Sequence, residues 1–241
     1  MARKVVITGG GTGIGAAVAA RFAADGDRVF LTGRRPAPLQ AVAGELGPLV
    51  TWETCDVTEP DEIERWRRTL PERVDVLVNN AGGNTDFDRP PAEDLTGLAG
   101  NWLANLRANL FSAVLVTEAL RDRLAPGGAV ISLSSIAADR GAGSYGAAKA
   151  AISSWNVDLA REVGPGGVTA NVVSPGFTER TEYFRDRLTD GRRSRLIEET
   201  ATGRPGTPDD VAGAIHFLAS RAARQITAQV LAVNGGAFPT R

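Results

Sequence analysis

Short apolar runs alternate with longer amphipathic stretches from one end of the chain to the other. This alternation is typical of βα units that stack into a parallel sheet. It predicts seven strands, at residues 5–8, 28–32, 49–54, 74–79, 129–133, 168–173 and 230–233. The stretches between them predict helices at 14–25, 37–46, 60–70, 98–124, 144–162 and 208–219, with a further helix within 181–200.

Glycine and proline mark the places where helices end. Pro126-Gly127-Gly128 and Gly164-Pro165-Gly166-Gly167 are turn signals that stop a helix before the next strand. No internal repeat or long linker divides the chain. We therefore predict one domain over residues 1–241, of α/β class, with a Rossmann-type doubly wound parallel sheet of seven strands and helices on both faces.

The composition excludes several classes of partner. The 241 residues are 43% hydrophobic, as in an ordinary soluble protein with a sizeable core. The net charge of −1 gives no attraction to nucleic acid or to an anionic membrane. No apolar run is long enough to cross a bilayer, and no signal segment precedes the first strand. We expect a cytoplasmic protein with no nucleic-acid and no membrane partner.

Scarce residue types limit the chemistry further. The only cysteine, Cys55, rules out a disulfide within the chain and has no context for a catalytic thiol. The only histidine, His216, lies among apolar residues of a predicted helix, so we expect a packed side chain rather than a base. No Cys/His metal site can form, and no Gly-x-Ser-x-Gly elbow is present. Acid–base chemistry is left to Tyr145 and Lys149.

Tyr145 and Lys149 stand four residues apart and share one face of a predicted helix. Of the 27 basic residues, 25 are arginine, and the only other lysine is Lys4. A lysine at this place therefore suggests that the site requires an ammonium group. A nearby cation favours the phenolate and lowers the pKa of a tyrosine, which would make Tyr145 a proton donor for a carbonyl. The alternative is an exposed pair on an alanine-rich helix.

A glycine-rich turn, Thr8-Gly9-Gly10-Gly11-Thr12-Gly13-Ile14-Gly15, follows the first strand and precedes a helix. Glycines there let the backbone turn tightly and approach a pyrophosphate, while the helix N-terminus supplies free N–H groups. The second strand ends in Gly33-Arg34-Arg35, without the carboxylate that would bind the ribose 2′-hydroxyl of NAD. Guanidinium groups suit a 2′-phosphate, so we predict NADPH/NADP rather than NADH, with Arg34 as the principal contact and Arg35 as a second. Alternatively, both arginines only solubilise the loop.

The spacing Gly9-x-x-x-Gly13-x-Gly15 resembles the opening motif of the classical short-chain dehydrogenase/reductase family. Asn79-Asn80-Ala81-Gly82, Tyr145 to Lys149 and Pro175-Gly176 match the landmarks of that family in the right order. Val233-Asn234-Gly235-Gly236 resembles its final strand and turn, with Asn234 where aspartate is commoner. The resemblance covers essentially the whole chain. Within that family, the chain is similar to 3-oxoacyl-thioester reductases.

The resemblance implies a catalytic set of Asn109, Ser135, Tyr145 and Lys149. Tyr145 would give its proton to the substrate oxygen as hydride arrives, and Lys149 would hold the nicotinamide ribose. Ser132, Ser134 and Ser135 are candidates for the donor to the carbonyl; we choose Ser135, with Ser134 next, although its distance from Tyr145 in sequence is shorter than usual. Asn109 would support a water-linked proton path to Lys149, whereas ordinary surface polarity is the alternative for Asn109, Asn105 and Asn101.

The resemblance also implies a cofactor-binding set. Asp56 and Val57 would contact adenine, although Asp56 could instead cap the following turn. Pro175, Gly176 and Thr178, or Thr181 in place of Thr178, would meet the carboxamide, and residues 178–204 would form a substrate lid with Tyr183 and Phe184 as apolar contacts. The predicted cofactor-binding residues are Gly9, Thr12, Gly13, Ile14, Gly15, Arg34, Arg35, Asp56, Val57, Asn80, Ala81, Gly82, Tyr145, Lys149, Pro175, Gly176 and Thr178.

Together these features predict an NADPH-dependent reductase of a ketone or aldehyde, with a small-molecule carbonyl or alcohol as its partner and no metal. The alternative is a non-catalytic dinucleotide-binding regulatory or scaffold protein on the same fold. Epimerisation or dehydration is disfavoured because the chain lacks the extra C-terminal domain of such relatives. By analogy with the family we expect a homo-oligomer, either a tetramer or a dimer.

Overall fold

A single seven-stranded sheet forms the centre of the molecule. The computed structural model describes residues 2–239, apart from the side chain of residue 186. The strands lie in the order β3-β2-β1-β4-β5-β6-β7, and every neighbouring pair is parallel. They are β1 (Lys4–Thr8), β2 (Arg28–Gly33), β3 (Val50–Thr54), β4 (Val74–Asn79), β5 (Leu124–Leu133), β6 (Thr169–Pro175) and β7 (Val230–Val233).

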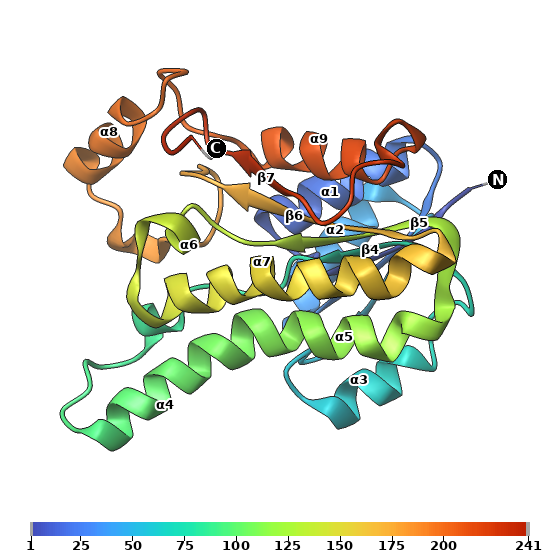
Figure 1. Ribbon diagram of the computed structural model, residues 1–241, viewed down its shortest axis with the longest axis horizontal. Helices are drawn as coiled ribbons and strands as arrows, with labels where there is room; N and C mark the ends of the chain where they lie inside the picture. Colours follow the sequence, from blue (N-terminus) through green and yellow to red (C-terminus); the bar gives the residue numbers. More distant parts are fainter. Residues whose placement is uncertain (1, 240–241) are drawn as a thin grey trace.

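Helices cover both faces of this sheet (Figure 1). α1 and α9 lie over one face, and α3, α5 and α7 lie over the other. The α-helices are α1 (Gly13–Ala24), α2 (Pro36–Leu46), α3 (Pro60–Arg67), α4 (Leu95–Leu106), α5 (Ser112–Leu120), α6 (Ala137–Arg140), α7 (Gly143–Val163), α8 (Asp190–Glu198) and α9 (Pro208–Leu218). Short 3₁₀ turns are η1 (Thr85–Asp88), η3 (Arg121–Arg123), η4 (Gly164–Gly166), η5 (Arg185–Arg187) and η6 (Arg221–Ala223), and η2 (Arg107–Phe111) is a π-helical turn.

The inner strands β1 and β4 are mostly apolar because both faces of the sheet are buried there, whereas the edge strands β3 and β7 are largely exposed. Alternate residues of β1 belong to two different cores: Val5 and Ile7 pack with α1 and α9, whereas Val6 packs with the opposite layer. This arrangement confirms the predicted doubly wound α/β sheet. No helix within residues 2–239 is both long enough and apolar enough to cross a membrane.

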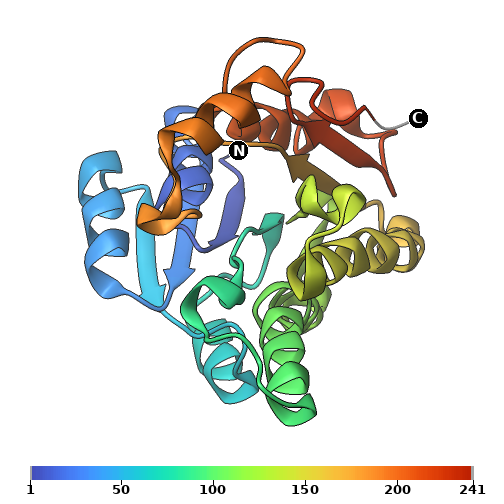
Figure 2. The ribbon, with the colours of Figure 1, turned by 90° about the vertical axis from the view of Figure 1, so that its left-hand side faces the viewer.

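The strand order reverses between β1 and β4, so the chain leaves these two neighbouring strands in opposite directions along the sheet. Ligands of open parallel sheets bind at such a switch point, outside the carboxyl ends of the strands. Figure 2 looks onto this edge and shows the segment that contains α8, in orange, on one side of it and α6, in yellow-green, on another. The edge therefore brings together the turn after β1, the loops after β4 and β5, and the segment after β6.

Two predicted boundaries were wrong. The helix predicted at 98–124 is divided into α4, the π-helical turn η2 and α5, and it ends before β5 begins at Leu124. Pro126-Gly127-Gly128 lies inside β5, where the pairing with β4 shifts register between Val74 and Val76. Gly128 is needed there because a Cβ at this position would lie 2.7 Å from the Asp75 carbonyl oxygen. The glycines thus permit an irregular strand rather than a turn before it.

The only histidine and the only cysteine of the chain both pack within the fold. His216 Nε2 lies 2.7 Å from Asp25 Oδ2, and its ring packs against Phe22. Cys55 is buried, and burial raises the pKa of its thiol to about 12, which makes it a poor nucleophile. Over residues 2–239, no group of three or more His, Cys, Asp or Glu side chains is placed to hold a metal ion.

Candidate active site

The glycine-rich turn leaves the start of α1 open to a ligand. Gly9 and Gly13 have φ values of +67° and +52°, a region that favours glycine. A Cβ on Gly15 would lie only 2.2 Å from the Gly9 carbonyl oxygen. The side chain of Thr12 makes no capping hydrogen bond, so no side chain occupies the first N–H groups of α1. The uncapped N–H groups of α1 suit a phosphate, and no side chain is needed to bind it.

The loop after β4 is tied to this turn by hydrogen bonds. Thr8 Oγ1 accepts from the backbone N–H groups of Asn80 and Ala81, at 3.1 and 3.0 Å. Asn80 Nδ2 donates to the carbonyl oxygens of Thr8 and Gly9, each at 3.0 Å. The structure therefore brings Asn80 and Ala81 beside Gly9, as the sequence predicts. A role for Thr8 could be found from the sequence only through its position before the glycines.

Arg34 and Arg35 are both exposed, but their surroundings differ. Arg35 Nη2 lies 2.5 Å from Glu182 Oε2, on the segment after β6. Arg34 makes no ion pair with any residue in the part of the chain that the structure describes. Of the two arginines, Arg35 is therefore the one tied to the segment after β6.

Tyr145 and Lys149 lie on the buried face of α7, each with about 4% of its surface exposed. Lys149 Nζ is 6.0 Å from the centre of the Tyr145 ring and donates a hydrogen bond of 2.8 Å to the Leu133 carbonyl oxygen, at the end of β5. The alternative of an exposed pair on an alanine-rich helix is therefore wrong. Both side chains point toward the carboxyl edge of the sheet.

The pKa values of this pair differ from the prediction. Burial raises the pKa of the Tyr145 phenol above its usual value, and Tyr183 raises it further, whereas a hydrogen bond with Ser135 lowers it. Burial lowers the pKa of Lys149 to about 7. The predicted acidification of Tyr145 by Lys149 is thus wrong for the protein alone, because desolvation disfavours the charged form of both groups. Helical spacing indicates that two groups are neighbours, but it does not indicate how deeply they are buried in the protein.

The three candidate serines have different partners. Ser135 lies close enough to the Tyr145 phenol to lower its pKa, and Ser135 Oγ accepts from the Ala137 N–H at 3.2 Å. Ser134 donates to the Lys149 carbonyl oxygen at 2.9 Å, and Ser132, inside β5, accepts from Asn79 Nδ2 at 3.3 Å. Of the three, Ser135 is therefore the one beside the phenol. The helix α6 fills the loop between Ser135 and Tyr145 and sets this register.

Asn109 and Asn105 are buried, so ordinary surface polarity is wrong for both. Asn109 Oδ1 accepts from the Gly83 N–H at 3.0 Å, and its Nδ2 donates to the Gly83 carbonyl oxygen at 2.9 Å. A Cβ on Gly82 would lie 2.6 Å from Asn109 Oδ1 and 3.3 Å from Lys149 Nζ. Asn109 and Lys149 thus converge on Gly82, and the π-helical turn around Asn109 is an irregularity often found at functional sites.

Comparison with known proteins identifies the family. A family model described as enoyl-(acyl carrier protein) reductase matches residues 9–237. The 3-oxoacyl-[acyl-carrier-protein] reductase FabG of Escherichia coli is 35% identical over 97% of this chain and 96% of its own. The chain belongs to the short-chain dehydrogenase/reductase family. This result confirms the family and the similarity to 3-oxoacyl reductases predicted from the motifs.

Solved structures of other short-chain dehydrogenases have the same fold. A short-chain dehydrogenase/reductase of Brucella melitensis, described as SDR:glucose/ribitol dehydrogenase, has a TM-score of 0.89 and 30% identity, over 99% of this chain and 97% of that one. A short-chain dehydrogenase of Burkholderia cenocepacia, in complex with NADP, has a TM-score of 0.86 and 32% identity, over 98% and 97% of the two chains. A 3-oxoacyl-[acyl-carrier-protein] reductase of Mycobacterium bovis, MabA, is 33% identical, over 98% of this chain and 93% of its own.

Asp56 and Thr178, two further residues predicted to contact the cofactor, form hydrogen bonds with other residues of the chain. Asp56 Oδ1 accepts from the N–H and hydroxyl of Thr58, at 3.0 and 2.8 Å, so it caps the turn as the alternative proposed. Its neighbour Val57 is buried. Thr178, also buried, donates to the Gly176 carbonyl oxygen at 3.2 Å. A Cβ on Gly176 would meet Asn234 at 2.7 Å, which explains a glycine after Pro175.

The segment after β6 lies directly on the other parts of the site. Thr181 approaches the phosphate turn, because a Cβ on Gly13 would come 3.4 Å from Thr181 Cγ2. Glu182 pairs with Arg35, and the Tyr183 ring lies 5.6 Å from the Tyr145 ring, measured between centroids. Sequence reasoning assigned Tyr183 only apolar contacts and missed its place beside Tyr145, because the two residues are far apart in the sequence.

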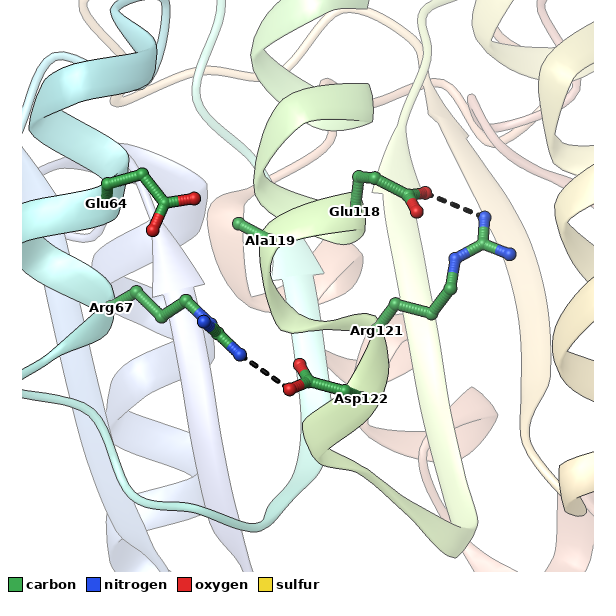
Figure 3. Close-up of a pocket in the computed structure, with 6 residues that line it drawn as sticks. All are labelled: Glu64, Arg67, Glu118, Ala119, Arg121 and Asp122. Carbon is green, nitrogen blue, oxygen red and sulfur yellow. Dashed lines mark hydrogen bonds and ion pairs between the residues drawn. The ribbon is translucent and has the colours of Figure 1, made fainter.

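A separate surface hollow lies between α3 and α5 and is shown in Figure 3. Four of its five charged side chains pair with one another: Arg67 with Asp122 at 2.5 Å and Arg121 with Glu118 at 2.8 Å. None of its lining residues, which are Glu64, Arg67, Glu118, Ala119, Arg121 and Asp122, is a predicted site residue. The predicted residues Ser135, Tyr145 and Lys149 lie instead at the carboxyl edge of the sheet.

Proposed function

We propose that this chain is an NADPH-dependent oxidoreductase that reduces a ketone or aldehyde to an alcohol, with Tyr145 as the proton donor. The observation that carries the proposal is a buried phenol, Tyr145, whose ring centre lies 6.0 Å from Lys149 Nζ, at the edge of the sheet that also holds the glycine-rich turn. A ketone reductase needs these parts together: a proton donor, a second hydrogen-bond donor for the oxygen and a place for the dinucleotide.

The residues present fit a dinucleotide with a 2′-phosphate. The uncapped start of α1 and the close backbone approach at Gly9 and Gly15 suit a pyrophosphate, and Arg34 suits a 2′-phosphate. The solved relative from Burkholderia cenocepacia is in complex with NADP, which supports the same choice for this chain. When bound, NADPH supplies the hydride. Asn80, Ala81, Gly82, Pro175, Gly176 and Thr178 would line the remainder of its site.

The raised pKa of Tyr145 gives the residue a clear role in reduction. The phenol stays protonated at neutral pH, so it is ready to give its proton to the carbonyl oxygen as negative charge develops there. Ser135 lies beside that phenol and would donate a second hydrogen bond to the same oxygen. The reverse reaction, alcohol oxidation, would need Tyr145 to accept the proton back.

Lys149 is suited to resupply that proton. An amine whose pKa is about 7 exchanges protons readily at neutral pH, and this one is held by the Leu133 carbonyl oxygen. Asn109 and Lys149 both lie close to Gly82. Asn109 would therefore extend the proton path beyond Lys149. Lysine is preferred to arginine here because a guanidinium is bulkier, planar and always charged.

Tyr145→Phe tests the proposal. The substitution removes one hydroxyl from a buried ring, so we expect turnover of a ketone to fall by about a hundredfold to ten-thousandfold, as for loss of a general acid. NADPH binding, measured by fluorescence titration, should be nearly unchanged. Turnover is followed by NADPH absorbance against a panel of ketones, aldehydes, quinones and acyl thioesters. A Tyr145→Phe enzyme that retained full turnover would contradict the assigned donor.

We also propose that the protein is a homo-oligomer. Apolar side chains on and just after α4 are exposed to solvent, and a second group lies on α9 and β7. Large exposed apolar patches on a monomer commonly mark contacts with another protein. The side chains are Leu95, Leu98, Trp102, Leu103 and Phe111 in the first group, and Phe217, Val230 and Leu231 in the second.

A further inference from the structure

A fully buried asparagine of α4, Asn105, connects two segments that follow β4 and β5. Asn105 Nδ2 donates to Asp86 Oδ1 at 2.9 Å and to Ser144 Oγ at 2.8 Å. Asn105 Oδ1 accepts from the Thr85 N–H at 3.1 Å. We call Asp86, Asn105 and Ser144 the asparagine bridge. The bridge joins η1, α4 and the start of α7.

The partners of the Asn105 amide fix its orientation. A backbone N–H can only donate and a carboxylate can only accept, so the amide oxygen must face Thr85 and the amide nitrogen must face Asp86. Both hydrogens of Nδ2 are then used, one on Asp86 and one on Ser144. An ionised aspartate has nearly the same shape but could donate neither bond. The bridge therefore depends on an amide at position 105.

The bridge reaches α7 at the residue before Tyr145. The N-cap residue of this helix, Ala142, makes no side-chain hydrogen bond. The Asp86 carboxylate instead lies 3.3 Å from Ser144 Oγ, in the first turn of the helix. A negative charge there interacts favourably with the positive end of the helix dipole. η1 thus supplies an anchor that the sequence at the start of α7 lacks.

The residue after Tyr145 is also held in place. Gly146 packs so closely on α6 that a Cβ there would lie 2.7 Å from the Ala137 carbonyl oxygen. The Gly146 N–H donates to the Ala142 carbonyl oxygen at 3.1 Å. Contacts at Ser144 and at Gly146 therefore fix the first turn of α7, and with it the point from which the buried phenol projects.

We propose that Asn105 is a positioning residue for Tyr145. This inference rests on the proposed function. Asn105 acts through Asp86 and Ser144, which hold the first turn of α7, rather than on the substrate itself. A proton donor must lie within hydrogen-bonding reach of the substrate oxygen, and a misplacement of about 1 Å can lower the rate about a hundredfold. Loss of the bridge should therefore lower kcat and leave NADPH binding unchanged.

Asn105→Asp tests the inference with little change in shape. The new carboxylate cannot donate and would lie against the Asp86 carboxylate. We expect kcat for a ketone to fall about tenfold to a hundredfold, while the Kd for NADPH, measured by fluorescence titration, stays within about twofold of wild type. An unchanged kcat, or an equal loss of NADPH affinity, would overturn the assignment.

A double variant, Asp86→Asn with Asn105→Asp, exchanges the amide and the carboxylate. The amide at position 86 can donate to the carboxylate at position 105, and the negative charge stays beside Ser144. Most of the lost kcat should therefore return. A double variant with no higher kcat than Asn105→Asp would contradict the bridge. If Asn105→Asp does not fold, Ser144→Ala removes only the link to α7 and should lower kcat about two- to tenfold; an unchanged kcat there would equally overturn the inference.

Hydrogen–deuterium exchange of residues 141–149, in the protein without NADPH, gives a readout that does not depend on turnover. Exchange should be at least about fivefold faster in Asn105→Asp, because the lost hydrogen bonds favour local opening of the helix start. Unchanged exchange would contradict the bridge. Asn101→Asp is the matched control: Asn101 lies one turn earlier on α4 and donates to the Pro90 carbonyl oxygen at 3.2 Å. It should change neither exchange nor kcat, whereas an effect of charge on α4 itself would appear in both variants.

The outcomes separate this inference from the proposed function. Thermal melting checks that each variant is folded. If Tyr145→Phe is inactive but Asn105→Asp keeps the full kcat, only the role of Asn105 fails. If the wild-type enzyme binds NADPH but reduces no carbonyl compound in the panel, the proposed function fails and this inference fails with it.

Discussion

Tyr145 and Lys149 are so deeply buried that the cost of removing a charge from water decides which form each side chain holds. Burial favours a protonated phenol and an uncharged amine, and the two groups therefore do not form an ion pair in the protein alone. The pair is better described as a protonated phenol beside a weakly basic amine. This property belongs to single residues, and single substitutions can test it.

Lys149→Met should change how stability depends on pH. The pKa of Lys149 is about 7 in the folded chain, whereas the ordinary value for a lysine is 10.5. Between pH 7 and pH 10.5 the unfolded chain therefore binds more protons than the folded chain. Wild-type stability therefore gains from Lys149 as pH rises from 7 toward 10, and the cost of charging the buried amine is greatest below 7. We expect the Tm of Lys149→Met minus that of wild type to be largest at pH 6 and to shrink by pH 10.

Melting followed by circular dichroism at pH 6, 8 and 10 measures this difference. The second lysine gives a matched control: Lys4→Met removes an amine that is only half-buried, and its Tm difference should vary little with pH. A Tm difference for Lys149→Met that stays constant across the range would contradict a lowered pKa.

Arg34 and Arg35 form a second matched pair of residues. Arg34 has no ion-pair partner among the described residues, whereas Arg35 is held by Glu182. Arg34→Ala should therefore raise KM for NADPH about tenfold with little effect on KM for NADH, because a charge-assisted hydrogen bond to phosphate is worth about 1.5–3 kcal/mol. Arg35→Ala should have the smaller effect. Steady-state kinetics with both cofactors decides this, and a wild-type preference for NADH would defeat the NADPH assignment.

At the scale of elements, the sequence predicted every strand and most helices because apolar runs and glycine turns are local signals. The turn before α1 and the helical face shared by Tyr145 and Lys149 could be predicted for the same reason. The π-helical turn at Asn109 and the irregular start of β5 could not, since they depend on packing against Gly83 and Asp75. The contact of Tyr183 with Tyr145 joins residues far apart in sequence, which no spacing rule reveals.

Gly15→Ala should disturb the junction between β1 and α1. The new Cβ would lie 2.2 Å from the Gly9 carbonyl oxygen and 2.7 Å from Asn80 Nδ2, and neither the turn nor the loop after β4 can yield without loss of hydrogen bonds. Overpacking of this kind costs about 1–3 kcal/mol, and NADPH affinity should fall with it. Gly44→Ala, on α2 with no atom within 4 Å, should instead stabilise the protein by up to about 1 kcal/mol. Urea unfolding compares the two; equal effects would contradict the close approach.

At the scale of the whole molecule, two apolar surfaces remain uncovered in a single chain. Leu95, Leu98 and Trp102 recur at helical spacing along α4, and Leu231 lies on β7, the strand at one edge of the sheet. Figure 1 shows α4 and β7 on different sides of the molecule. A second copy of the chain can cover each surface through a twofold contact, and two different twofold contacts generate a tetramer.

Two separate interfaces, on α4 and on β7, predict that the proposed oligomer dissociates in two steps. Trp102→Glu places a charge in the α4 surface only, so the contact through β7 should survive and the mass should fall from that of a tetramer to that of a dimer. Adding Leu231→Glu should then give a monomer. Gln40→Glu introduces the same charge at an exposed position of α2 and should leave the mass unchanged. Light scattering after size exclusion measures each mass. A Trp102→Glu protein with the wild-type mass would show that α4 is not an interface, because a buried glutamate without a partner is incompatible with a packed apolar contact.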